Sequence, residues 1–112
     1  MIIHVFIQNE AGSNRKHYHD EKTLEWKRVE ELPRHYPSAY GFVVGTTADD
    51  GCNVDCFVIT EKSLKTGALV ECEIAGLMEQ VFAQLGDTRV VVGRFLGPEA
   101  AESYVTARRD PM

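Results

Sequence analysis

The sequence predicts a mainly β protein of the α+β class, folded as a small β-barrel with one helix near its C-terminus. Short runs rich in β-branched and aromatic residues recur along the chain, and turn residues separate them roughly every ten positions. The helical crossovers that a parallel sheet needs are missing between these runs. A helix is expected over residues 99–108, so it follows the strands rather than alternating with them.

Each element has a local signal. The expected strands are residues 2–7, 16–20, 24–29, 41–46, 54–60, 68–75 and 89–95. Residues 77–85 fit a short helix or a strand, and periodicity does not decide between them. Residues 49–51 read Asp-Asp-Gly, which is a strong turn signal. Pro98 suits the first position of a helix and Arg108 suits its last turn.

Length and charge limit the class of protein. The chain has 112 residues, and we expect them to form one domain over 1–112. A hydrophobic share of 44% is enough for a real core. The formal net charge of -5 argues against a nucleic-acid partner, and an anionic ligand would need metal ions or a local basic patch. No apolar run approaches transmembrane length, so no membrane partner is expected.

The cysteines indicate a reducing compartment. There are three, Cys52, Cys56 and Cys72, and an odd number without a signal peptide argues against a disulfide framework. The opening residues MIIHVFIQ are too short for a secretory signal and have no basic flank. We therefore expect a cytoplasmic protein.

The segment DDGCNVDC, residues 49–56, is a candidate cation site. Asp50 and Asp55 flank a glycine turn, and carboxylates spaced so closely can converge on a hard divalent cation. The alternative is a polar turn with solvated aspartates. Cys52 lies between the two, where a thiolate would favour zinc over magnesium, although a lone cysteine is more often a small buried residue.

Two histidines form a second candidate. On a strand, His17 and His19 would point to the same face. With a cysteine they would make a zinc site. The alternative is an exposed strand with two solvated imidazoles, because no recognised zinc-ligand spacing accompanies them.

Scattered cations and phenols form a third candidate. Lysine and arginine bind phosphate oxygens well, but each such residue alone also fits a solvated surface group. The group consists of Lys16, Arg28, Tyr40 and Arg89. No phosphate-binding glycine loop and no nucleophile elbow is present in the sequence.

The order of several motifs resembles the soluble inorganic pyrophosphatase family over residues 7–92. GSNRKHYHD at 12–20 resembles the family's GSRNKYEYD, and KRV at 27–29 resembles its DRV. The most specific match is YPSAYGFVVGT at 36–46, which resembles YPADYGFIPGT. DGCNVDCFV at 50–58 resembles D-G-D-P-x-D followed by a hydrophobic strand.

Two further matches follow in order. TGALVECEIAGL at 66–77 resembles the family's Pro-Gly and VVEVRPIGLL-like strand, and GDTRV at 86–90 resembles its D-x-K before a strand. The resemblance implies a five-stranded, OB-like barrel, a homo-oligomer and Mg²⁺-dependent hydrolysis of pyrophosphate, or of another phosphate-bearing small molecule. Mn²⁺ and Zn²⁺ are the alternative metals.

The resemblance also assigns roles to single residues. It implies metal-binding aspartates at Asp50, Asp55 and Asp87. It implies phosphate-binding groups at Lys16, Arg28 and Tyr40, with Arg89 standing where the family has a lysine. The catalytic group then consists of Asp50, Cys52 and Asp55, in which Cys52 replaces the aspartate that helps to activate the attacking water.

Departures from the family pattern keep two functional classes open. Gln8 and Tyr18 stand where the family has glutamates, Cys52 replaces the central aspartate, and Asn53 replaces the proline. Acidic groups are lost while most of the phosphate-binding cations remain. The chain is then either a weakened metal-dependent pyrophosphatase or a non-catalytic homologue that binds phosphate or nucleotides or serves as an assembly partner.

Overall fold

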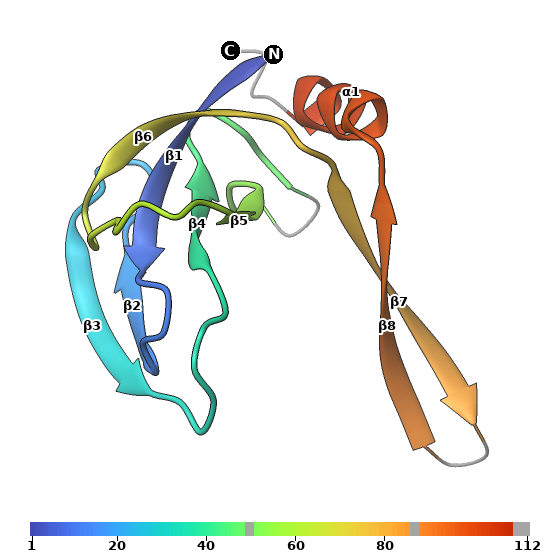
Figure 1. Ribbon diagram of the computed structural model, residues 1–112, viewed down its shortest axis with the longest axis horizontal. Coiled ribbons are helices and arrows are strands. Elements are labelled where there is room, and N and C mark those ends of the chain that lie inside the picture. The colour runs from blue at the N-terminus through green and yellow to red at the C-terminus, as the bar shows by residue number, and fades with distance from the viewer. Residues whose placement is uncertain (49–50, 86–87, 109–112) are drawn as a thin grey trace.

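The computed structural model describes residues 1–48, 51–85 and 88–108, and the side chains of residues 80–93 and 107–108 lie outside this description. The fold is mainly β with a C-terminal helix, as the sequence predicts (Figure 1). In order along the chain the elements are β1 (Ile2–Asn9), β2 (Arg15–His19), β3 (Trp26–Glu31), β4 (Ala39–Val43), β5 (Asp55–Val58), β6 (Leu69–Glu73), β7 (Leu77–Leu85), β8 (Thr88–Leu96) and α1 (Pro98–Arg108).

All strand pairs are antiparallel, so the expectation of a sheet without parallel crossovers is confirmed. The largest sheet has the strand order β5-β4-β1-β6, while β2 pairs with β3 and β7 pairs with β8. The closed five-stranded barrel is not confirmed. Among the described residues, hydrogen-bonded pairing divides the strands into these three sheets, and no ladder closes them into one ring.

The core lies against one face of the central strand β1. Val5 and Ile7 of this strand are fully buried, as expected for β-branched residues on the inner face of a sheet. Other buried side chains complete this core cluster, namely Ala39, Val43 and Val54. Tyr104 of α1 packs against the same cluster, so the helix closes over the sheet.

The opposite face of β1 carries the β2–β3 hairpin. The Phe6 ring lies 5.3 Å from the Phe42 ring and 4.9 Å from the His19 ring of β2, measured between centroids. Aromatic contacts of this kind fix one sheet over another. The hairpin is thereby held beside β4, which places the two parts of the candidate site near one another.

A β-bulge in β1 strengthens this attachment. Ile7 pairs with Gly41 and Asn9 pairs with Tyr40, so Gln8 is the extra residue of the ladder. The bulge directs Asn9, which is 1% exposed, so that its Oδ1 accepts a hydrogen bond of 2.6 Å from the backbone N–H of His17. The bulge therefore connects the central sheet to β2.

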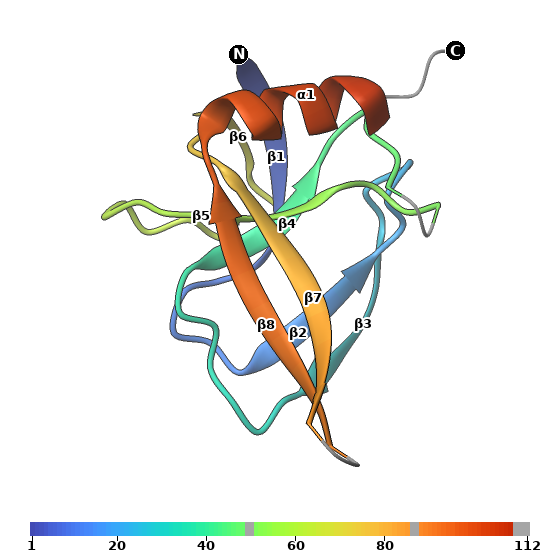
Figure 2. The same ribbon diagram turned by 90° about the vertical axis from the view of Figure 1, so that its right-hand side faces the viewer.

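The C-terminal helix lies across the end of the sheet where β1 begins (Figure 2). Its buried face contains Ala101 and Val105, which are 3% and 8% exposed. Their spacing of four residues places both side chains on the same side of the helix. Glu99 lies in the first turn, where a negative charge interacts favourably with the positive end of the helix dipole. Glu102 adds a 3.4 Å ion pair with the terminal amine of Met1.

The segment whose periodicity was ambiguous, Leu77–Leu85, is a strand. It pairs with β8 from Leu77↔Leu96 to Leu85↔Thr88. The cross-strand pairing therefore selects the strand over the helix, a choice that the periodicity of the sequence leaves open. The β7–β8 hairpin extends away from the central sheet (Figure 1). No helix in the described part of the chain is long and apolar enough to cross a membrane.

Candidate functional site

One face of the β2–β3 hairpin gathers two cations around a tyrosine ring. Lys16 pairs with Glu30 and Tyr18 pairs with Arg28 in the antiparallel register, so all four side chains share one face. The Arg28 guanidinium carbon lies 3.9 Å from the centroid of the Tyr18 ring, and the Lys16 Nζ lies 5.0 Å from it. The cations are attracted to the electron-rich face of the ring.

Glu30 holds both the ring and the arginine. The Tyr18 hydroxyl donates to Glu30 Oε2 at 3.0 Å, and Arg28 Nη1 donates to Glu30 Oε1. The hydrogen bond from Arg28, with the one from Tyr18, lowers the pKa of Glu30, and the same hydrogen bond to Glu30 raises the pKa of Arg28. Part of the hydrogen-bonding capacity of the Arg28 guanidinium is therefore already used by the Glu30 carboxylate.

A second cluster lies where β4 and β5 pair. Tyr40 of β4 is hydrogen-bonded through its hydroxyl to Asp55 of β5. Burial, followed by the Asp55 carboxylate, raises the pKa of Tyr40 well above its usual value. The phenol therefore stays protonated at neutral pH. The Tyr40 ring also contacts Tyr36, at 5.5 Å, and Phe57, at 5.1 Å between centroids.

Tyr36 connects the two clusters. Burial raises the pKa of Tyr36, the Lys16 ammonium opposes that shift, and Tyr18 and Asp55 add to it. Lys16 and Tyr18 from the hairpin and Asp55 from the central sheet therefore act electrostatically on the same phenol. The Tyr36 ring itself stacks on the Tyr40 ring.

The loop that carries Cys52 is fixed from both sides. Thr46 Oγ1 donates to the Val43 carbonyl at 2.7 Å and accepts from the Val54 N–H at 2.9 Å. The Asn53 N–H donates to Glu21 Oε1 at 3.0 Å, which connects the loop to the turn between β2 and β3. Cys52 itself is exposed on this loop.

The expected site is thus described only in part. Lys16, Arg28, Tyr40 and Asp55 lie along the two clusters just described. Asp55, expected as a metal ligand, and Tyr40, expected to bind phosphate, are hydrogen-bonded neighbours. Three other expected site residues fall outside the described positions or side chains, namely Asp50, Asp87 and Arg89.

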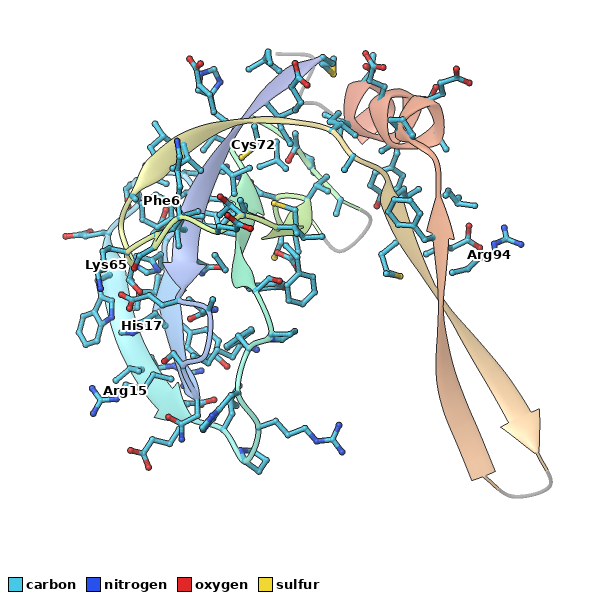
Figure 3. The ribbon with its side chains drawn as sticks, in the orientation of Figure 1. Phe6, Arg15, His17, Lys65, Cys72 and Arg94 are labelled. Carbon is cyan, nitrogen blue, oxygen red and sulfur yellow. The ribbon has the colours of Figure 1, made fainter. Side chains whose placement is uncertain are left out.

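The histidine pair does not support the zinc hypothesis. His17 lies on β2 (Figure 3), and its Nδ1 accepts a 3.0 Å hydrogen bond from Trp26 Nε1. Burial, followed by the charge of His17, lowers the pKa of His19, and the buried Nδ1 of His19 has no hydrogen-bond partner. The described residues contain no group of three or more His, Cys, Asp or Glu side chains able to hold a metal ion.

Sequence reasoning missed Glu30, Tyr36 and Glu21. A signal existed for Glu30, because side chains two residues apart on a strand share a face, and Arg28 was already a candidate. Tyr36 begins the motif that contains Tyr40, and the two rings stack. No local signal predicts the contact of Glu21 with Asn53, which joins residues 32 positions apart.

Comparison with known proteins identifies the family. The family model for inorganic pyrophosphatase matches residues 5–104. The chain is 32% identical over 92 residues to the inorganic pyrophosphatase of Thermus thermophilus, covering 80% of this chain and 53% of that protein. It is 34% identical over 92 residues to that of Neisseria meningitidis serogroup A, covering 80% and 52%.

The solved structures that resemble this fold are also inorganic pyrophosphatases. The crystal structure of the Thermus thermophilus inorganic pyrophosphatase has a TM-score of 0.65 and 32% identity, covering 82% of this chain and 53% of that one. An inorganic pyrophosphatase from Neisseria gonorrhoeae has a TM-score of 0.76 at 21% identity, covering 96% and 88%, and this likeness concerns the fold alone. The chain belongs to the inorganic pyrophosphatase family, and it spans about half the length of the curated relatives it matches.

Proposed function

We propose that this chain binds pyrophosphate and hydrolyses it slowly to two phosphates in a Mg²⁺-dependent reaction, on a five-stranded, OB-like fold. The observation that carries the proposal is the placement of Lys16 and Arg28 on the paired strands β2 and β3, and of Tyr40 and Asp55 on the paired strands β4 and β5, at positions that match the family motifs. Cations next to a protonated phenol can hold the oxygens of a diphosphate and stabilise charge that develops on them.

The described side chains have separate roles in this proposal. Lys16 and Arg28 bind phosphate oxygens, and their contacts with the Tyr18 ring hold them on one face. Tyr40 remains a neutral donor because its pKa is raised by burial. Its hydroxyl is hydrogen-bonded to Asp55 in the free protein and would donate to a bound phosphate.

Metal binding in this proposal starts from Asp55. Asp55 offers hard oxygen ligands, which suit Mg²⁺, but one carboxylate alone does not make a metal site. We propose Asp50 and Asp87 as its partners, with Cys52 nearby as a softer donor that would favour Mn²⁺ or Zn²⁺. A bound ion would neutralise phosphate charge and lower the pKa of an attacking water.

The expected weakness has a physical reason at two described positions. Gln8, where the family has a glutamate, is the bulged residue of β1, and its Nε2 lies 3.4 Å from the His17 carbonyl. Tyr18, where the family has another glutamate, supports cations instead of a metal. The second candidate function is phosphate or nucleotide binding without turnover. It is favoured because the chain keeps the cations Lys16 and Arg28 but lacks the carboxylates at Gln8 and Tyr18.

The deciding experiment measures phosphate release from pyrophosphate in Mg²⁺, Mn²⁺ and Zn²⁺ in turn, with and without a chelator. Slow release that needs a divalent ion supports the hydrolase. Tight binding of pyrophosphate without release supports the binding protein. Absence of both would reject the proposed ligand.

Removal of one hydroxyl tests the role of Tyr40. We expect Tyr40→Phe to lower kcat/KM for pyrophosphate about 10- to 100-fold, because a hydrogen bond to a charged group is worth about 1.5–3 kcal/mol. Tyr36→Phe is the matched control, since it also loses one hydroxyl from the same stacked pair. Equal losses in the two variants would count against a special role for Tyr40.

Removal of a competing carboxylate tests the role of Arg28. Glu30→Gln removes the negative charge that competes with an anionic ligand for Arg28, although the amide oxygen can still accept a hydrogen bond, so we expect pyrophosphate to bind about 2- to 5-fold more tightly, in line with an exposed ion pair. Isothermal titration calorimetry in Mg²⁺ measures the change. The control, Glu31→Gln, removes the same charge from the next residue of β3, on the opposite face. A similar gain in both variants would mean that only net charge matters.

A further inference from the structure

Phe57 places an exposed aromatic ring directly beside the proposed phosphate site. It lies on β5 two residues after Asp55, so both side chains point to the same face of the strand. The residue is 50% exposed although phenylalanine is a residue type usually found inside. Pyrophosphate has no apolar part, so its binding alone gives this ring no function.

The exposed ring continues a row of aromatic contacts. The Phe57 ring lies 5.1 Å from the Tyr40 ring with an interplanar angle of 62°, and Tyr40 stacks on Tyr36 at 5.5 Å. An edge-to-face contact with Tyr40 leaves Phe57 held in orientation while much of its surface stays open. The row therefore begins at the phosphate-binding phenol and ends on an open ring.

From this row we propose that the ligand of the site is an organic diphosphate with a flat, unsaturated ring, of the nucleoside diphosphate class. The diphosphate would lie on Lys16, Arg28 and Tyr40, and the ring would stack on Phe57. The inference rests on the proposed function, because it names the substrate class of the same site. Stacking on an aromatic side chain suits any base, since every base has a π-face.

Charge and position favour such a ligand over a protein partner. The charge of Lys16 acts on Tyr36 at one end of the row, and the exposed Phe57 ring forms the other end, with the Tyr40 ring between them. A ligand with a charged and a flat apolar end matches that order. A second copy of this chain, with its net charge of -5, would bring like charge to the carboxylates of the same face.

The experiment compares three ligands that cannot be hydrolysed at the bridging atom, by calorimetry in Mg²⁺. Methylenediphosphonate tests the phosphate site, α,β-methylene-ADP adds a base, and the methyl ester of methylenediphosphonate matches its ester linkage without a ring. We expect α,β-methylene-ADP to bind on the order of 5- to 100-fold more tightly than the methyl ester.

Variants locate the effect. Phe57→Leu keeps an apolar side chain at a half-exposed position, so the fold should persist. In this variant the affinities for α,β-methylene-ADP and for the methyl ester should differ by less than about 2-fold. Phe57→Tyr should keep the preference. Ile59→Ala is the control, because Ile59 is 86% exposed and lies two residues beyond Phe57.

The outcomes separate the two proposals. If methylenediphosphonate binds and the two esters bind equally, the ring inference is overturned and the proposed function stands. If the preference exists but survives in Phe57→Leu, the ring binds elsewhere and the inference is also overturned. If none of the three ligands binds, the phosphate site itself is rejected and the inference falls with it.

Discussion

Gly41→Ala is expected to destabilise the protein strongly, because Gly41 lies in β4 of the central sheet, directly against β1. A Cβ at Gly41 would collide with the carbonyl oxygen of Phe6 and would lie 3.2 Å from Ile7 Cα. Both are backbone atoms of the paired strand β1, so no side-chain rotation relieves the contact. We expect a loss of about 3 kcal/mol or more, at the upper end of overpacking effects.

Thermal unfolding measures this loss. A cost of that size would lower the melting temperature by about 12 °C or more for a domain of this length. Gly45→Ala is the matched control, because Gly45 has a φ of 78° and nothing within 4 Å of the added Cβ. It should cost only the left-handed backbone strain of about 1–2 kcal/mol. Equal effects in the two variants would show that strand spacing at Gly41 is not limiting.

The same substitution connects stability to the site. Gly41 pairs with Ile7 at the edge of the bulge, and the residue that precedes it in β4 is Tyr40 of the candidate site. Separation of β4 from β1 at this point would shift Tyr40 relative to the β2–β3 hairpin. Any Gly41→Ala protein that does fold should therefore also bind pyrophosphate more weakly.

The strands were predictable because their signals are local. Residues 2–7 are β-branched and aromatic, and the strand runs Ile2–Asn9. Pro98 and Glu99 predict a helix that starts at residue 99, and the observed helix starts at Pro98. What lies beyond local sequence is pairing between distant strands. The bulge at Gln8 and the division into three sheets depend on which backbone groups meet, and composition does not encode that.

The site shows the same limit. Arg28 and Tyr40 were found because motifs of the family surround them. Glu30 and Phe57 were not, since their importance comes from contacts of their side chains, between Glu30 and Tyr18 across β2 and β3 and between Phe57 and Tyr40 across β4 and β5. A motif identifies a residue by its neighbours in sequence, whereas these side chains are defined by their neighbours in space. The residues that adapt the site to this chain are therefore the ones that resemblance cannot name.

Restoring carboxylates should raise activity, beginning with Cys52→Asp. Cys52 is exposed on the loop before β5, so a charged aspartate there would remain in contact with water. It would return a hard oxygen ligand that Mg²⁺ prefers to a thiolate. Since one charge-stabilising group is typically worth 10²–10³ in rate, we expect a gain in Mg²⁺-dependent phosphate release of up to about 10²-fold. Cys52→Asn is the control, with a similar shape and no charge.

The full effect should need Gln8→Glu and Tyr18→Glu as well, because residues that share a site are not additive. Tyr18→Glu also removes the ring that holds Lys16 and Arg28, so this change alone is expected to weaken phosphate binding before it helps metal binding. The triple variant should therefore exceed the sum of the single changes. A triple variant that folds, binds Mg²⁺ and releases no phosphate would show that missing carboxylates are not what limits turnover. Wild-type protein that already turns over many pyrophosphates per second would refute the premise from the other side.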